Sequence, residues 1–255
     1  SIGKSSNDSD INNANGISVK LSALHPRYYF AQYQLVMTEL LPRIKQLCVQ
    51  AAKYNIGLSI DAEESYRLDI SLDIFAALAR DTDLQGWQGL GFVLQAYQKR
   101  AIFVIDWLRE LTEKVGRKMM VRLVKGAYWD TEIKRAQEIG MENYPVFTKK
   151  EYTDLSYIAC AKVILENDKF SYPQFATHNA LTISTIIEMA GNQPYEFQKL
   201  YGMGDALHSQ LVNNKENVRI YAPIGKSDDL LAYLMRRLLE NGANSNFVSK
   251  VISPE

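Results

Sequence analysis

Residues 118–130 read KMMVRLVKGAYWD, and this stretch indicates the architecture of the chain. A short apolar run carries Arg122 and then Lys125 into a Gly-Ala-Tyr-Trp turn. A charge inside a strand is costly unless a partner or a ligand compensates it. We therefore predict a buried strand whose carboxyl end presents cations, a glycine and two aromatic rings to an anionic, planar ligand.

Strand-like and helix-like segments alternate on both sides of this stretch. Apolar runs with strand character occur at residues 17–24, 56–61, 90–96, 119–125, 173–177, 196–202 and 218–223. Segments with apolar residues at helical spacing lie between them, at residues 33–54, 70–80, 98–115, 156–165 and 181–190. Alternation sustained over this length predicts a parallel sheet with helical crossovers.

Two α/β architectures have this alternation. A doubly wound sheet commonly carries a glycine fingerprint after its first strand, and no GxGxxG follows any predicted strand here. A (β/α)8 TIM-like barrel instead spreads its site over the ends of many strands. Polar residues stand at or near most predicted strand ends, namely Lys20, Asp61, Gln95, Arg122, Thr177 and Tyr221. The sequence therefore favours a distorted barrel.

The strand count falls one short of a closed barrel. Seven strands are predicted, whereas this kind of barrel has eight. Residues 1–16 are polar and supply no further strand candidate. We expect residues 1–255 to form one barrel domain of a longer, multidomain protein, with residues 1–16 as a polar lead-in and the first strand upstream.

The composition restricts the classes of partner. Lys and Arg total 29, as do Asp and Glu, so nothing global indicates nucleic acid. No apolar run approaches the roughly 20 residues that span a bilayer, and the start does not resemble a signal peptide. Cys48 and Cys160 lie in helical patterns and are expected to be small buried apolar residues of a reducing compartment. The three histidines have no metal-ligand spacing, so we expect no metal site.

A helix with two different faces is predicted at residues 227–244, SDDLLAYLMRRLLENGAN. One face is apolar, and the other carries Tyr233, Arg236, Arg237 and Glu240. Two interpretations remain open. The polar face is either a solvated surface with Arg–Glu pairs or a twin-guanidinium clamp, whose planar forks match carboxylate oxygens.

Other polar residues also have two interpretations each. Lys20 could hold an anion or form a Schiff base, or it could face outward between helices. Asp61 could be a base, an electrostatic anchor or a helix cap. Gln95 suits the polar edge of a heterocycle but could be a satisfied core amide, and Asn179 could be an N-cap.

Taken together, the segments resemble the proline dehydrogenase family. The resemblance is closest to the proline dehydrogenase domain of the bacterial bifunctional proline-utilisation flavoenzymes. It rests on the segments ISVKLSALHPRY, IDAEES, GFVLQAYQKR, VRLVKGAYWDTEIKRAQ, YPQFATHNA, YEFQKLYGMG, RIYAPIG and LLAYLMRRLLENGAN. These segments extend over residues 17–247, with matching order and spacing.

The resemblance implies a distorted (β/α)8 barrel that binds FAD at the carboxyl ends of its strands. The implied reaction is oxidation of L-proline to Δ1-pyrroline-5-carboxylate by hydride transfer to flavin N5, the first step of proline catabolism to glutamate. Electrons would pass to a membrane quinone. The parent chain would carry a pyrroline-5-carboxylate (glutamate semialdehyde) dehydrogenase domain. It would lie in the bacterial cytoplasm at the inner membrane, and this domain would bind no nucleic acid.

The resemblance also implies roles for particular residues. Lys20, Arg236 and Arg237 would hold the substrate carboxylate. Tyr128 and Tyr221 would pack on the pyrrolidine ring, with Asp61 orienting the cations and Tyr221. The cofactor would be held by Gln95, Arg122, Lys125, Gly126, Ala127, Trp129, Thr148, Thr177, His178, Asn179 and Glu240.

Three other functions are possible for a barrel with these residues. A class I aldolase-like enzyme would use Lys20 or Lys125 as its Schiff-base amine. A non-catalytic module would bind an amino acid or a flavin without turnover. A methylenetetrahydrofolate-reductase-like flavin barrel would not need the twin arginines for its substrate.

Overall fold

The computed structural model describes residues 10–166, 169–225, 230–231 and 233–235, which form an α/β fold. One seven-stranded sheet has its strands in chain order, and every neighbouring pair is parallel. The strands are β1 (Gly16–Val19), β2 (Gly57–Ile60), β3 (Leu90–Gln95), β4 (Met119–Val124), β5 (Ser171–Ala176), β6 (Glu196–Leu200) and β7 (Val218–Tyr221). A strand is present at each of the seven predicted positions, although the first covers only the first half of its predicted range.

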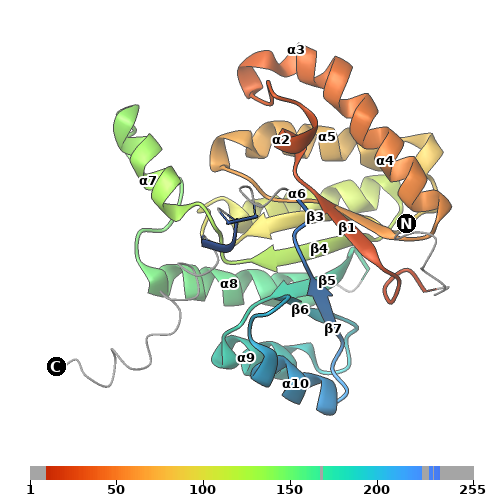
Figure 1. Cartoon of the computed structure of the whole chain (residues 1–255), viewed down its shortest axis with the longest axis vertical. Coiled ribbons are helices and arrows are strands. Elements are labelled where there is room, and N and C mark those ends of the chain that lie inside the picture. The colour runs from red at the N-terminus through yellow and green to blue at the C-terminus, as the bar shows by residue number, and fades with distance from the viewer. Residues whose placement is uncertain (1–9, 167–168, 226–229, 232, 236–255) are drawn as a thin grey trace.

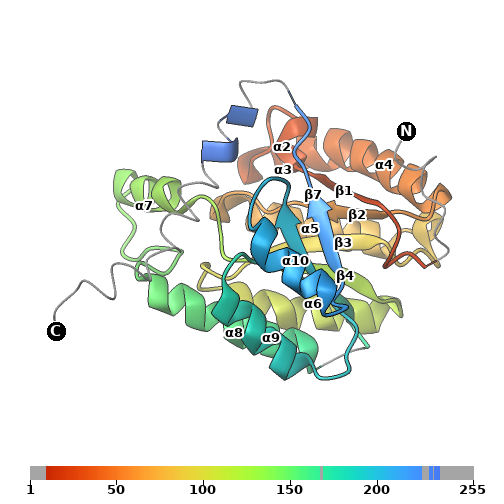
Figure 2. The ribbon, with the colours of Figure 1, turned by 60° about the horizontal axis from the view of Figure 1, so that its bottom comes forward.

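Helices connect successive strands (Figures 1 and 2). The α-helices are α2 (Leu21–Leu24), α3 (Tyr33–Leu35), α4 (Leu41–Lys53), α5 (Leu68–Arg80), α6 (Ala101–Val115), α7 (Trp129–Glu138), α8 (Lys150–Leu165), α9 (Ala180–Ala190) and α10 (Asp205–Asn213). Shorter turns are η1 (Phe30–Gln32), η2 (Val36–Leu40), η3 (Ser65–Arg67) and η4 (Thr82–Leu84). No helix within the described ranges is long and apolar enough to cross a membrane.

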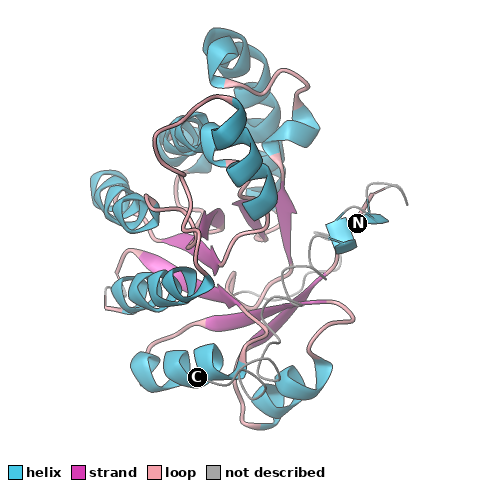
Figure 3. Cartoon of the chain, turned by 90° about the vertical axis from the view of Figure 1, so that its left-hand side faces the viewer, coloured by secondary structure: helices cyan, strands magenta, loops and turns pink. Residues whose placement is uncertain are grey.

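The sheet curls around a central space, with helices on its outer side (Figure 3). Arg122 of β4 reaches across this space to the Ser18 hydroxyl of β1 at 2.7 Å and to Gln198 of β6 at 3.5 Å. Such contacts join strands that are not neighbours in the sheet. The described strands show no ladder between β1 and β7, so the curled sheet is an incomplete barrel.

The predicted strand at residues 17–24 is wrong in its second half. β1 ends at Val19, and Leu21–Leu24 form one helical turn. Short apolar runs do not distinguish a strand from a buried helical turn, and Leu21 is fully buried in the turn. Lys20 therefore lies just beyond the strand, at its carboxyl end, instead of interrupting it.

The helices α7 and α10 were not predicted from the sequence. Each buries only two residues: Glu132 and Ala136 in α7, and His208 and Leu211 in α10. The spacing of apolar residues is the main sequence signal of a helix. A helix that buries only two residues has almost no such spacing.

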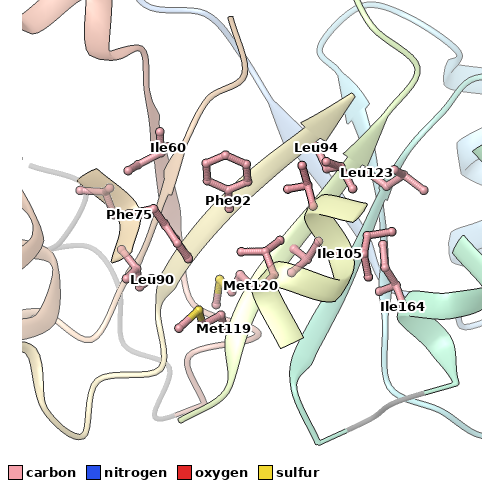
Figure 4. Close-up of a cluster of buried hydrophobic side chains, with 14 of the residues drawn as sticks. Ile60, Phe75, Leu90, Phe92, Leu94, Ile105, Met119, Met120, Leu123 and Ile164 are labelled. Atoms are coloured by element: carbon pink, nitrogen blue, oxygen red, sulfur yellow. The ribbon is translucent and has the colours of Figure 1, made fainter. Parts of the chain in front are cut away.

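The core fills the layer between the sheet and its outer helices (Figure 4). Leu94 of β3 and Leu123 of β4 pack there with Ile105 of α6. Cys48 and Cys160 are free and buried, and burial raises the pKa of these thiols to about 12 and about 11. Both cysteines behave as the small apolar residues that the sequence predicted.

A buried polar network joins the two ends of the sheet. Nε of Arg219 in β7 lies 2.8 and 3.0 Å from the two carboxylate oxygens of Glu196. The same guanidinium donates to the carbonyl oxygens of Asn12 at 2.5 Å and Ala14 at 2.7 Å, in the segment before β1. Arg219 thus fastens the last strand to the chain that leads into the first.

Replacing Arg219 with alanine is expected to lower the free energy of unfolding by about 3 kcal/mol, because Glu196 is 3% exposed and would lose its cation. Urea unfolding checks this. Arg109→Ala is the control: its ion pair with Asp106 is exposed on both sides, so a loss below about 0.5 kcal/mol is expected. Equal losses in the two variants would show that Arg219 fastens nothing.

Candidate functional site

A cavity of about 1130 Å³ lies inside the curled sheet. Eleven of the seventeen predicted site residues line it: Lys20, Asp61, Gln95, Arg122, Lys125, Gly126, Ala127, Tyr128, Thr177, His178 and Tyr221. They come from the ends of β1 to β5 and β7, because parallel strands bring their carboxyl ends to one side of the sheet. The structure thus brings these eleven predicted residues to one cavity.

One carboxylate joins two cations at the centre of this cavity. Oδ2 of Asp61 lies 3.0 Å from Nζ of Lys20, and Oδ1 accepts a hydrogen bond from Nη2 of Arg122 at 2.9 Å. Two positive charges and one negative charge leave this group of three side chains with an excess positive charge. The cavity is thus suited to an anion such as a carboxylate.

Lys20 is held as an ammonium ion. Its Nζ also donates to the Tyr128 hydroxyl at 2.8 Å and to the Ala62 carbonyl oxygen at 3.4 Å. Burial by itself would lower the pKa of Lys20, but the Asp61 carboxylate and Tyr128 raise it well above its usual range. A charged ammonium binds anions but is not a nucleophile, so these contacts favour the anion-holding interpretation over the Schiff base.

Two tyrosines border the cationic group. The guanidinium of Arg122 lies 5.8 Å from the ring centroid of Tyr221, and Nζ of Lys20 lies 5.4 Å from that of Tyr128. Both distances are within the range of a cation–π interaction. The rings supply apolar surface beside the charges, as a small ligand with a carboxylate and an apolar body would need.

The turn after β4 is tied to the end of β3. The Ala127 amide donates to Oε1 of Gln95 at 3.5 Å, and the Tyr97 amide donates to the carbonyl oxygen of Lys125 at 2.8 Å. Gly126 has a φ of 136°, and a Cβ at this position would lie 2.5 Å from the Tyr97 ring. The turn can therefore lie on Tyr97 only with glycine here.

Lys125 has a partner that the sequence analysis missed. Its Nζ pairs with Asp154 of α8, whose other oxygen binds Lys150 at 2.8 Å. Burial alone would raise the pKa of Asp154, but the two lysines lower it. Asp154 escaped notice because the predicted helix began at residue 156. The i, i+4 spacing of Lys150 and Asp154 was the available signal.

The residues after β5 divide into two groups. Thr177 and His178 line the cavity, and the Thr177 hydroxyl accepts from the Asn179 amide at 3.2 Å. The Asn179 side chain turns to the helix that follows, where it accepts from the Thr182 amide at 2.9 Å. Asn179 is thus the N-cap of α9, and it does not line the cavity.

His208 packs behind His178, with ring centroids 5.4 Å apart, and its Nδ1 lies 2.9 Å from the Gly204 carbonyl oxygen. Burial lowers the pKa of His208 below 6.5. The unfolded chain therefore binds this proton more readily, so the free energy of unfolding should fall as the pH drops below about 6.5.

Urea unfolding between pH 7.5 and 5.5 tests this expectation for His208. His208→Asn should have a shallower pH slope than the wild type, by at most about 1.4 kcal/mol per pH unit, the effect of one proton. Identical slopes for the two proteins would contradict the expectation.

Two further predicted residues lie away from the cavity lining. Nε1 of Trp129 donates to the Phe147 carbonyl oxygen at 3.0 Å, and Trp129 is 42% exposed. Thr148 is exposed beside Phe147. The last three, Arg236, Arg237 and Glu240, lie outside the described residues, as does most of the predicted final helix.

Fold and site together define an α/β protein with a cation-lined cavity at the strand ends of a curled parallel sheet. A family model described as proline dehydrogenase matches residues 1–250. The chain belongs to the proline dehydrogenase family.

Individual relatives agree with this membership. The bifunctional protein PutA of Klebsiella aerogenes and that of Escherichia coli K12 are each 56% identical over 260 residues, covering 98% of this chain and 20% of the relative. Proline dehydrogenase 2 of Bacillus subtilis is 32% identical over 205 residues, covering 78% of this chain and 59% of the relative. The chain thus spans about a fifth of the length of the PutA relatives.

Solved structures show the same fold. A crystal structure of a mutant proline utilization A (PutA) from Bradyrhizobium japonicum has a TM-score of 0.92 and 54% identity, covering 97% of this chain and 26% of that one. PutA from Bdellovibrio bacteriovorus, inactivated by N-propargylglycine, has a TM-score of 0.86 and 33% identity over 91% of this chain and 25% of that one.

Proposed function

We propose that this chain oxidises L-proline to Δ1-pyrroline-5-carboxylate with FAD as the acceptor, as the first step of proline catabolism. The observation that carries the proposal is the group formed by Lys20, Asp61 and Arg122 inside the cavity of a proline dehydrogenase family member. Proline combines a carboxylate with a small apolar ring. The cations and the two tyrosines offer complementary surfaces for these parts.

The cavity residues suit a flavin dinucleotide. The volume of about 1130 Å³ exceeds the roughly 300–1000 Å³ typical of small-ligand pockets, so it leaves space for a large cofactor beside a small substrate. Cations, a side-chain amide and hydroxyl groups are the donors that phosphates and the polar edge of a flavin accept. The proposed cofactor contacts are Gln95, Arg122, Lys125, Gly126, Ala127, Trp129, Thr148, Thr177, His178, Asn179 and Glu240.

When bound, FAD supplies the acceptor for a hydride from the proline carbon next to nitrogen. The protein binds and orients. Lys20, with Arg236 and Arg237, holds the substrate carboxylate, and Asp61 keeps Lys20 charged. Tyr128 and Tyr221 pack on the pyrrolidine ring and fix its orientation. Arg122 supplies a positive charge beside the proposed cofactor contacts, where it favours developing negative charge.

The contacts of the lysines argue against an aldolase. A Schiff-base lysine must be neutral when it attacks a carbonyl. Burial of the amine without anionic partners is the usual cause of this neutral state. Lys20 has Asp61 at 3.0 Å, and Lys125 has Asp154. The Asp61 contact keeps Lys20 charged, and the ion pair with Asp154 occupies the Lys125 amine.

We further propose the setting of this domain. An eighth strand, from outside this sequence, would close the gap between β1 and β7 and complete a (β/α)8 barrel. The name of the PutA relatives, bifunctional, supports a parent chain with a second dehydrogenase domain. The electron acceptor would be a membrane quinone, reached from the cytoplasmic side by peripheral contact.

Steady-state assay of L-proline with a soluble quinone tests the activity. We expect Δ1-pyrroline-5-carboxylate and reduced quinone in equal amounts, and no lysine adduct after borohydride treatment. A borohydride-trapped adduct on Lys20 or Lys125 would support the aldolase. Bound flavin without turnover would support the non-catalytic module.

A further inference from the structure

Helix α7 stands apart from the other helices of the fold (Figure 1). It begins directly after Tyr128, and of its ten residues only Glu132 and Ala136 are buried. An element that buries so little apolar surface gains little from packing, and such elements open most easily. Its attachment to the rest of the protein must therefore depend on particular polar contacts.

Glu132 makes the principal polar contact. Its carboxylate accepts hydrogen bonds from the Ser65 amide at 2.5 Å and from the Ser65 hydroxyl at 2.6 Å, and the residue is 2% exposed. A buried carboxylate is tolerated when donors satisfy it, and charge-assisted bonds of this length are strong. One turn along the helix, the guanidinium of Arg135 lies 4.2 Å from the Tyr66 ring centroid. Consecutive residues of η3 thus hold α7 at two points.

The two elements joined by Glu132 both support Lys20. η3 follows the turn that begins with Asp61, whose carboxylate lies 3.0 Å from Nζ of Lys20. α7 follows Tyr128, whose hydroxyl accepts from the same Nζ at 2.8 Å. Glu132 does not line the cavity. Its contact with Ser65 links the segment after Asp61 to the helix after Tyr128, and this link lies outside the cavity.

We propose that Glu132 is a positioning residue that fastens α7 to η3 and so keeps the Tyr128 hydroxyl on Lys20. The inference rests on the proposed function, since its kinetic consequence concerns L-proline. When Glu132 no longer binds Ser65, α7 opens and Tyr128 moves with it. Lys20 and the ring surface of Tyr128 then lose their mutual orientation. We expect binding of L-proline to weaken more than binding of the cofactor, because the proposed cofactor contacts outside α7 remain in place.

Hydrogen–deuterium exchange measures the fastening without any turnover. Glu132→Gln replaces one acceptor oxygen with an amide N–H₂ donor, which would face a donor of Ser65. Ser65→Ala removes only the hydroxyl donor. We expect residues 129–138 to exchange at least tenfold faster in Glu132→Gln, and less so in Ser65→Ala, with α5 unchanged. Glu138→Gln is the control, since Glu138 lies on the same helix but is exposed, and it should exchange like the wild type. Unchanged exchange of α7 in both Glu132→Gln and Ser65→Ala overturns the proposal.

Kinetics then test whether Glu132 acts through Tyr128. Glu132→Gln should raise KM for L-proline at least tenfold with kcat within about threefold of the wild type. In a Tyr128→Ala background the same change should raise KM less than twofold, since the ring and the hydroxyl that Glu132 positions are both gone. Full additivity of the two substitutions would overturn the role. If the wild type does not oxidise L-proline, the proposed function fails, while the exchange measurement still decides whether Glu132 fastens α7.

Discussion

Replacing Asp61 with asparagine is expected to lower kcat/KM for L-proline by about 100- to 1000-fold. Asp61 is the carboxylate shared by Lys20 and Arg122, at 3.0 and 2.9 Å. Removing one partner of a largely buried ion pair costs about 3–5 kcal/mol, because the remaining charges are uncompensated. The two cations would repel each other, and burial would then lower the pKa of Lys20, so the carboxylate clamp loses charge and geometry together. Steady-state kinetics measure the effect.

The control for this substitution is Asp69→Asn. Asp69 lies on α5 and pairs with Arg100 at 2.8 Å, but both side chains are about half exposed. Exposed pairs contribute little, so kcat/KM should stay within about twofold. An Asp61→Asn variant that kept wild-type kcat/KM would show that the cationic group does not bind the substrate.

Gly126→Ala is expected to reduce bound FAD to less than a tenth of the wild-type content. A Cβ at Gly126 would meet the Tyr97 ring at 2.5 Å, and the φ of 136° is one that alanine rarely adopts. The turn would have to lift off β3, and Lys125 and Ala127, both proposed to contact the cofactor, would move with it. Flavin released by denaturation, measured per mole of purified protein, gives the occupancy.

Gly116→Ala is the control for Gly126→Ala, because it introduces the same kind of backbone strain without a steric collision. Gly116 ends α6 with a φ of 66°, and a Cβ there meets nothing within 4 Å. This variant should lose about 1–2 kcal/mol of stability and keep its flavin. If Gly126→Ala retained flavin as Gly116→Ala does, the turn after β4 would have no part in cofactor binding.

Much of the site was predictable because parallel strands place their carboxyl ends together. Lys20, Asp61 and Arg122 come from three strands, yet each stood at or near a predicted strand end. The curl of the sheet determines which of these strand ends lie close together. The contact between Arg122 and Ser18 spans 104 residues and depends on that curl, and no periodicity in the sequence encodes it.

The polar network at the other end of the sheet was missed for a related reason. Glu196 and Arg219 lie near the starts of β6 and β7, at the opposite edge of the sheet from the carboxyl ends where the site is predicted. Arg219 also donates to the carbonyl oxygens of Asn12 and Ala14, in a segment whose sequence has no strand or helix signal. Polar residues inside a predicted strand remain ambiguous until their neighbours are known.

Asn179 and Lys20 each had more than one predicted role, and the structure bears on both. Asn179 was named both as a possible N-cap and as a cofactor contact; the cap is confirmed, and the contact remains a proposal. Lys20 was placed inside a strand, where a Schiff base and an outward lysine were both plausible. Its position just after β1, with Asp61 and Tyr128 as partners, makes it a stable cation instead.

The absorbance spectrum of the purified protein, before and after anaerobic L-proline, tests whether a cationic cavity holds proline against a flavin. We expect the visible absorption of oxidised flavin at about one flavin per chain, and we expect it to be lost after about one equivalent of L-proline. A protein without flavin, or with flavin that excess L-proline leaves oxidised, would contradict it.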